Sequence, residues 1–431
     1  MRIRGPLAGA LVAAVLAATA ACTGGGGGND RAWPVNEPRT GVSQPPPAAR
    51  TEAKAYDPPK AFAARGVVLP SLTEASLKVS VLHGTTVYTP TAAGIQALDT
   101  VTAQVSDTFA PEGPPLATGP TGLVQGPAVT GPPALLEVGG RELIVAPFVV
   151  LVPGRGTTAG RTELNLIAID PADNTAAWTM SIPLPTRPGK VSLIGAHGDR
   201  VFVATQDSYG STGSVHALDT AVRTLAWSKD GFFGATVTGG SVIGVEPQGS
   251  SSYMQVVTAL SVADGSRRWS LPNNRYETRI TYIGPKLVVV EGRDYSNGRP
   301  SFQLVDGDTG TDAVPAWIGT SGALGGAYNM RCLYDQRAVT VCSGVGIVMG
   351  LDAMTGNQLW RLPDQAAGRV APSATVAWHG AVYGTASGPV ILDATTGQDV
   401  ATPDIAPVLV SANVGIAADT SGKVRAYPAT G

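Results

Sequence analysis

Apolar and polar positions alternate in short runs along most of the chain. From about residue 75 onward, runs of four to seven residues rich in aliphatic and β-branched side chains are broken by turn residues, as in SVHALD (214–219) and IVMGLD (347–352). Runs of this length and composition predict β-strands, and the short breaks predict antiparallel hairpins. The 54 glycines and 34 prolines among 431 residues favour many turns and few long helices.

A longer period is superimposed on this alternation. An apolar strand, an Asp, a turn that often contains Thr-Gly, and then a Trp recur in that order. The Asp position is filled in turn by Asp99, Asp170, Asp219, Ser261, Asp306, Asp352 and Asp393, and by Tyr427 in a degenerate last copy. These positions lie about 47 residues apart on average, which is the size of one four-stranded propeller blade.

A second landmark recurs upstream of each Asp position. It is a two-residue turn between apolar stretches, found at His83-Gly84, Gly139-Gly140, His197-Gly198, Gly239-Gly240, Gly284-Pro285, Asp335-Gln336, His379-Gly380 and Ala412-Asn413. The two landmarks together predict an all-β protein, a β-propeller of four-stranded antiparallel blades, with eight blades expected and seven as the alternative. One such sheet cannot bury both its faces, whereas sheets packed radially cover one another.

The two ends of the predicted ring are expected to meet. The last unit reaches Gly431 before its outermost strand could form. A spare apolar segment lies at residues 64–70 (ARGVVLP). We expect this segment to supply the missing strand.

Five of the seven tryptophans occupy one repeat position: Trp178, Trp227, Trp269, Trp317 and Trp360. Because an indole buries a large area and still needs a partner for its N–H, this recurrence predicts docking between blades. A surface that binds sugars or a flat cofactor is the functional alternative. The aspartates of the repeat are expected to cap turns in which glycine supplies a positive φ.

The first residues have the pattern of an export signal. Arg2 and Arg4 precede an uncharged run at 7–21, which is shorter than the ~20 apolar residues of a spanning helix. The run ends in Thr-Ala-Ala-Cys, similar to a bacterial lipobox, and this resemblance implies diacylglyceryl modification of Cys22. An ordinary signal peptidase site and an uncleaved anchor are the alternatives.

These features divide the chain into three parts. Residues 1–21 are interpreted as a lipoprotein signal peptide, 22–65 as the lipidated Cys and a Gly/Pro-rich flexible linker, and 66–431 as the propeller domain. The acyl chains would hold the protein in the cell envelope, on the outer face of the cytoplasmic membrane.

Cys332 and Cys342 flank a turn near Arg337, which is midway between them. In a hairpin centred there they would face each other closely enough to form a disulfide, and export would place them in an oxidising compartment. Two buried thiols are the alternative.

The sequences GLDAMTGNQLW (350–360) and ALDTAVRTLAW (217–227) resemble the tryptophan-docking motif of the pyrroloquinoline-quinone (PQQ) propeller repeat. That family includes quinone-dependent dehydrogenases, BamB-like lipoproteins of outer-membrane assembly, and sensor domains. The dehydrogenases typically carry a disulfide between adjacent cysteines and a calcium site. This chain has no Cys-Cys pair, so we expect no cofactor, and PQQ is a possibility that the sequence does not support.

Few residues suggest chemistry. Three of the four histidines precede Gly at the same hairpin turn, so repeat geometry explains them better than metal binding. The segment DGDTGTD (306–312) lacks the Gly and Glu that complete a calcium loop. The net charge of −2 gives no support for nucleic-acid binding.

The sequence therefore favours a monomeric, non-enzymatic interaction platform or assembly scaffold whose partner is an envelope or membrane protein. A ligand-sensing module and a dehydrogenase are the alternatives. Loops carry the contacts of propellers. The candidate contact segments are 107–139, 153–162, 206–214, 247–253 and 293–299.

Overall fold

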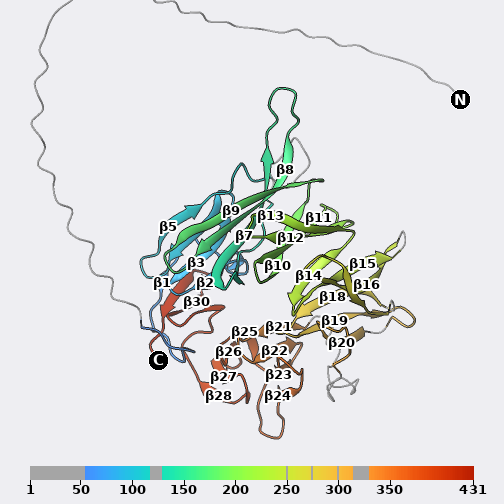
Figure 1. The fold of residues 1–431 in the computed structure, drawn as a ribbon. Coiled ribbons are helices and arrows are strands. Elements are labelled where there is room, and N and C mark those ends of the chain that lie inside the picture. The colour runs from blue at the N-terminus through green and yellow to red at the C-terminus, as the bar shows by residue number, and fades with distance from the viewer. Residues whose placement is uncertain (1–53, 117–128, 249–250, 273–274, 299, 314–329) are drawn as a thin grey trace, which may run out of the picture. The chain divides into compact units, whose positions relative to one another are not determined.

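The structure is a computed structural model. It describes residues 54–116, 129–248, 251–272, 275–298, 300–313 and 330–431. The chain separates into a unit of residues 1–51 and a unit of residues 52–431, and all described residues belong to the second. This second unit is the predicted all-β propeller, with eight antiparallel sheets arranged around a ring (Figure 1).

Each sheet is one blade, and in blades 1–7 the strands follow one another in sequence from the centre of the ring outward. Blade 1 comprises β2 (Val81–His83), β3 (Thr86–Thr91), β4 (Gly94–Asp99) and β5 (Gln104–Phe109). Blade 2 comprises β6 (Ala134–Val138), β7 (Arg141–Val152), β8 (Arg161–Asp170) and β9 (Thr175–Leu184). Blade 3 comprises β10 (Lys190–His197), β11 (Arg200–Gln206), β12 (Gly213–Asp219) and β13 (Thr224–Asp230). Blade 4 comprises β14 (Phe233–Thr238), β15 (Ser241–Gln248), β16 (Ser251–Ser261) and β17 (Arg267–Ser270).

The same order continues in the second half of the ring. Blade 5 comprises β18 (Arg275–Tyr282), β19 (Leu287–Asp294) and β20 (Pro300–Asp306). Blade 6 comprises β21 (Arg331–Tyr334), β22 (Val339–Gly344), β23 (Ile347–Asp352) and β24 (Gln358–Leu362). Blade 7 comprises β25 (Ser373–Trp378), β26 (Ala381–Thr385), β27 (Pro389–Asp393) and β28 (Asp399–Ala401). Blade 8 comprises β29 (Leu409–Val410), β30 (Val414–Ala418), β31 (Val424–Pro428) and β1 (Val67–Val68).

The expected ring closure is present. Strand β1 pairs antiparallel with β31, with Val67 opposite Ala426 and Val68 opposite Arg425. The N-terminal segment thus forms the outermost strand of the last blade. Helix α1 (Glu74–Leu77), capped by Thr73, lies between β1 and β2. Blade 5 has three strands among the described residues, and the position of Trp317 falls outside them.

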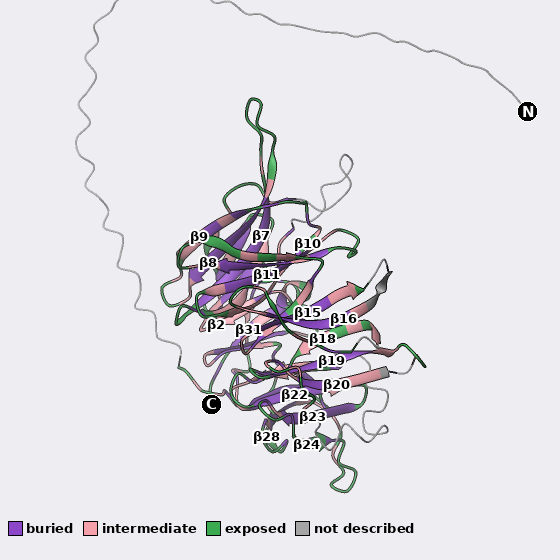
Figure 2. Cartoon of the chain, turned by 45° about the vertical axis from the view of Figure 1, so that its right-hand side comes forward, coloured by how far each residue is buried: buried purple, intermediate pink, exposed green. Residues whose placement is uncertain are grey.

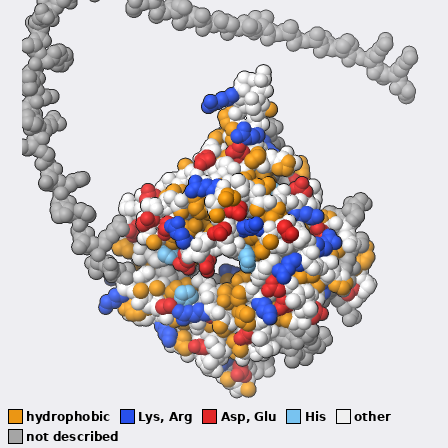
Figure 3. All heavy atoms as spheres, in the orientation of Figure 1, with side chains coloured by type: hydrophobic (Ala, Val, Ile, Leu, Met, Phe, Trp, Pro, Cys, Tyr) orange, Lys and Arg blue, Asp and Glu red, His pale blue; other side chains and the backbone are white. Residues whose placement is uncertain are grey.

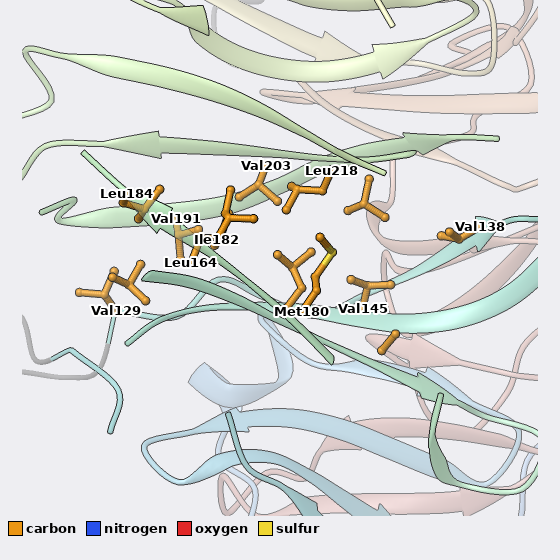
Figure 4. Close-up of a cluster of buried hydrophobic side chains, with 14 of the residues drawn as sticks. Val129, Val138, Val145, Leu164, Met180, Ile182, Leu184, Val191, Val203 and Leu218 are labelled. Carbon is orange, nitrogen blue, oxygen red and sulfur yellow. The ribbon is translucent and has the colours of Figure 1, made fainter. Parts of the chain in front are cut away.

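The core is divided among the contacts between blades. Buried apolar side chains of the described residues form eight clusters, and each cluster joins two neighbouring blades. Figure 4 shows the cluster in which Met180 and Ile182 of blade 2 meet Val203 and Leu218 of blade 3. Burial of each such side chain contributes about 1.5–3 kcal/mol.

The period-two pattern of the sequence explains how one strand serves two clusters. In β11, Val201 and Val203 pack toward blade 2, while Phe202 between them packs toward blade 4. Alternate side chains of a strand point to opposite faces of its sheet, so every blade is apolar on both faces. Figure 2 shows the result, with buried middle strands and more exposed outer ones.

The folded unit begins earlier than the sequence indicated. Residues 54–65 were assigned to the linker, yet they contact blades 7 and 8: the Tyr56 N–H donates to the Ala412 carbonyl at 2.7 Å and the Ala63 N–H to Pro428 at 2.8 Å. Phe62 is 6% exposed and packs among residues of both blades. No helix among the described residues is long and apolar enough to span a membrane.

Candidate functional site

The turns that join the first and second strands of the blades gather on one side of the ring, which we call the inner-turn face. Three of them carry His-Gly, at His83, His197 and His379. Gly84 and Gly198 have φ values of +54° and +58°, and His379 itself has +47°. These two-residue turns need positive φ, which is why glycine follows the histidines. Figure 3 shows histidine and acidic side chains beside a hollow on the visible face.

A cavity of about 460 Å³ lies within this face and is lined by the innermost strands and turns of blades 1, 2, 6, 7 and 8. We call it the inner-turn cavity. Its apolar lining includes Val81, Leu135, Val376 and Leu409. Polar side chains also line it, namely His83, Glu142, Gln336, His379 and Asn413. Such a mixture of apolar wall and few polar groups is typical of binding sites.

The N-terminal segment is fastened at the edge of this cavity by one carboxylate. Asp57 Oδ1 lies 2.6 Å from His379 Nδ1, and Asp57 Oδ2 accepts a hydrogen bond of 2.5 Å from Arg337 Nη2. Arg337 also donates to the His379 carbonyl at 3.1 Å, and the His379 ring stacks on Trp378 with centroids 3.9 Å apart. We call Asp57, Arg337 and His379 the Asp57 clasp. It connects the N-terminal segment to blades 6 and 7.

Blade 2 carries two further carboxylates in this region, and one of them, Glu142, lines the cavity. Glu137 and Glu142 are directly opposed in the β6–β7 pair, and both are exposed. The described residues offer Glu142 one partner, His83 Nε2 at 4.0 Å. Arg141, beside Glu142, is already paired with Asp170 at 2.5 Å. This part of the rim is therefore negatively charged.

The fourth histidine lies away from this face. His216 in β12 is 3% exposed, and its Nε2 is 3.1 Å from Thr205 Oγ1. Burial lowers the pKa of His216 from its usual value, with a smaller opposing contribution from Asp230. The side chain thus favours the neutral form within the sheet.

The turns between the second and third strands lie at the opposite ends of the blades and carry four of the candidate contact segments. The β7–β8 hairpin projects from the ring with exposed residues at 153–160 (Figure 1). Tyr209 and Tyr295 are 94% and 64% exposed. The segments 107–139 and 247–253 fall partly outside the described residues, although Leu116 and Val129 pack onto blade 2.

The tryptophans of the repeat contact the next blade along the chain. The indole N–H groups of Trp227, Trp269 and Trp360 donate to the carbonyls of Val262, Gly307 and Ala394 at 3.2, 3.1 and 2.6 Å. An added Cβ at Gly265, Gly310 or Gly397 would meet the respective indole at 2.5–2.8 Å. Trp178 packs against the cluster between blades 2 and 3. These four tryptophan rings therefore form contacts between blades. Trp317 lies outside the described residues.

The aspartates of the repeat accept hydrogen bonds from the turns that follow them. Asp352 Oδ1, for example, accepts from the backbone N–H groups of Met354 and Thr355 at 3.1 and 2.8 Å. Equivalent bonds are made by Asp99, Asp170, Asp219, Asp306 and Asp393. Each carboxylate is occupied by its own turn.

The predicted disulfide is present. Cys332 and Cys342 are directly opposed in the β21–β22 pair and bonded. Cys22 lies outside the described residues. Within the described part of the chain, no three His, Cys, Asp or Glu side chains are grouped so that they could hold a metal ion.

Sequence reasoning missed the clasp and the opposed carboxylates. Glu137 and Glu142 flank the Gly139-Gly140 turn symmetrically, so the hairpin prediction could have placed them opposite each other. The sequence around Asp57 could not indicate its contact with Arg337 and His379, because this Pro-rich stretch has no periodic pattern.

Comparison with known proteins supports the resemblance. Residues 163–305 match the family model described as "Outer membrane protein assembly factor BamB", which confirms the predicted similarity to PQQ-type, BamB-like propellers. No curated protein sequence matches the chain.

Comparison with solved structures finds several partial matches. BamB from Moraxella catarrhalis is 15% identical over 84% of this chain and 98% of its own, with a TM-score of 0.38. The quinohemoprotein alcohol dehydrogenase ADHIIG from Pseudomonas putida HK5 is 12% identical over 87% and 76%, with a TM-score of 0.39. The AfRom2 CNH domain is 11% identical over 85% and 99%, with a TM-score of 0.39. Structural similarity at these TM-scores carries no information about the function of this protein.

The described residues do not reproduce the adjacent-cysteine disulfide and calcium site that the resemblance implies for the quinone-dependent dehydrogenases. The disulfide joins residues ten positions apart on paired strands and not adjacent cysteines. Among the described residues, no group of carboxylates is placed so that it could bind calcium.

Proposed function

We propose that this protein is a lipid-anchored, extracytoplasmic propeller that acts without catalysis as an interaction platform for a protein of the cell envelope. The match of residues 163–305 to the BamB family model carries the proposal. The export signal and Cys22 of the sequence support the envelope location. The repeat residues support a scaffold, because Asp352 and Trp360 are both occupied by turn and blade contacts.

Anchoring is tested first. Cells that express the full chain or Cys22→Ser are labelled with an alkyne fatty acid, and membrane and soluble fractions are compared. We expect label and membrane retention for the wild type and loss of both for Cys22→Ser. Label on both proteins, or on neither, would contradict lipidation at Cys22.

The platform role is tested by site-specific photocrosslinking in intact membranes. A photoreactive phenylalanine analogue replaces exposed Tyr209 or Tyr295, each in a separate variant. We expect a discrete protein adduct at one or more of these positions, identified by mass spectrometry. Absence of protein adducts at every position, together with alcohol or sugar oxidation by the PQQ- and calcium-reconstituted protein, would favour the dehydrogenase alternative.

One observation favours a second candidate, the ligand-sensing module. The inner-turn cavity, at about 460 Å³, is large enough to hold a small molecule. This candidate predicts that a small molecule copurifies with the protein and is released on denaturation, where mass spectrometry would detect it.

A further inference from the structure

We propose that the inner-turn cavity receives a lysine- or arginine-bearing segment of a partner protein, with the Glu137–Glu142 pair as the site for its charge. This proposal rests on the proposed platform role and names the chemistry of the partner. It is carried by three features of the described residues: a cavity, its apolar lining and two opposed carboxylates on one rim.

The carboxylate pair is unfavourable for the fold alone. Glu137 and Glu142 are directly opposed, so their side chains project from the same side of the β6–β7 pair. Like charges placed directly opposite in antiparallel strands are destabilising. Arg141, which precedes Glu142 in the chain, is held by Asp170, and among the described residues the partner of Glu142 is a histidine nitrogen at 4.0 Å. A bound cation would relieve this repulsion.

The pair and the cavity share one surface. Glu142 and Leu135 both line the cavity, and Leu135 is two residues from Glu137 on β6, so Glu137 projects on the same side. The carboxylates therefore stand over an apolar wall that includes Val81 and Leu409.

A lysine or arginine matches this arrangement better than a bare cation. Its methylene stem can lie along the apolar wall while its charged head stays at the rim with the carboxylates. A metal ion would need a group of several ligands, and the described residues hold none. The Asp57 carboxylate does not compete for the partner's charge, because Arg337 and His379 already hold it.

The test uses the folded full-length chain in detergent and two fluorescein-labelled peptides, GLKLKLG and its glutamate counterpart GLELELG. Fluorescence anisotropy at low salt should detect binding of the lysine peptide and weaker or no binding of the glutamate peptide. The double substitution Glu137→Gln/Glu142→Gln should raise the dissociation constant of the lysine peptide by at least tenfold. The matched control, Glu74→Gln/Asp404→Asn, removes two exposed carboxylates outside the cavity lining and should bind as the wild type does.

A stability readout separates this role from a structural one. Glu137→Gln alone should raise the melting temperature at low salt, and the gain should disappear in 0.5 M salt as screening removes the repulsion. Equal binding of the lysine peptide to the wild type and the double variant would overturn the proposal, as would preference for the glutamate peptide. If a crosslinked envelope partner is retained by Glu137→Gln/Glu142→Gln, the platform role stands and the cavity proposal fails.

Discussion

The carboxylate of Asp57 lies 2.5 Å from Nη2 of Arg337, although 280 positions separate the two residues along the chain. Asp57 precedes every strand, and Arg337 belongs to the first turn of blade 6. Together with the pairing of β1 and β31, this contact closes the ring at a second place. The N-terminal segment therefore contributes to the propeller through side chains as well as through a strand.

Removal of the clasp should weaken ring closure slightly. Asp57→Ala is expected to cost about 1 kcal/mol of unfolding free energy, since both partners are nearly half exposed and such pairs contribute little each. Chemical denaturation measures the change. Asp404→Ala removes an exposed carboxylate outside the clasp and serves as the control. A loss of equal size in both variants would show that the clasp does not hold the segment.

Deletion of residues 60–72 should have a much larger effect. It removes β1 and the buried side chains of Phe62, Leu69 and Leu72, which are 6%, 1% and 5% exposed. Losses of this kind cost about 2–5 kcal/mol for each side chain, so the melting temperature should fall by at least about 10 °C. Val68→Ala keeps the strand and should change little. An unchanged cooperative transition after the deletion would rule out closure by this strand.

The docking of Trp360 can be tested through the glycine it covers. Gly397 has a φ of +68°, and an added Cβ would lie 2.5 Å from the indole. Gly397→Ala should therefore cost about 3 kcal/mol, from backbone strain and displacement of the ring together. Gly422, with a φ of +79° and open space around it, provides the matched control.

Gly422→Ala should cost about 1 kcal/mol, because it carries the backbone strain alone. The difference between the two variants in urea denaturation isolates the contact with the indole. If both variants lost the same unfolding free energy, the Trp360 indole would move aside without a cost, and its docking would contribute nothing to stability.

Stability should fall on acidification because of His216. Burial lowers its pKa in the folded protein, so the unfolded chain binds the proton more readily. The stability that neutral His216 contributes to the fold is complete above the pKa of about 6.5 that a histidine has in the unfolded chain. This stability is lost as the pH falls from that value through the lower pKa of His216 in the folded protein. His216→Gln should flatten this part of the pH profile. His197→Gln, which changes an exposed histidine of the same blade, is the matched control for the loss of one imidazole.

The sequence predicted the architecture well because the repeat acts locally. Turn glycines, capping aspartates and alternating strands each follow from a few neighbouring residues, and eight copies reinforce one another. The Cys332–Cys342 disulfide followed from hairpin register for the same reason. The clasp could not be predicted, because Asp57 meets Arg337 only after the whole ring has formed. The opposed Glu137 and Glu142 were within reach of the sequence, but the cavity that they border is built from five blades.

The donation of β1 to blade 8 has a consequence for biosynthesis. Strand β31, its partner, spans Val424–Pro428, so β1 is translated long before the strand with which it pairs. A prematurely terminated product lacks β31, the strand with which β1 would pair. Blade 8 can therefore close only after residues 424–428 have been made, and products that stop before them would keep an open seam that proteases can attack.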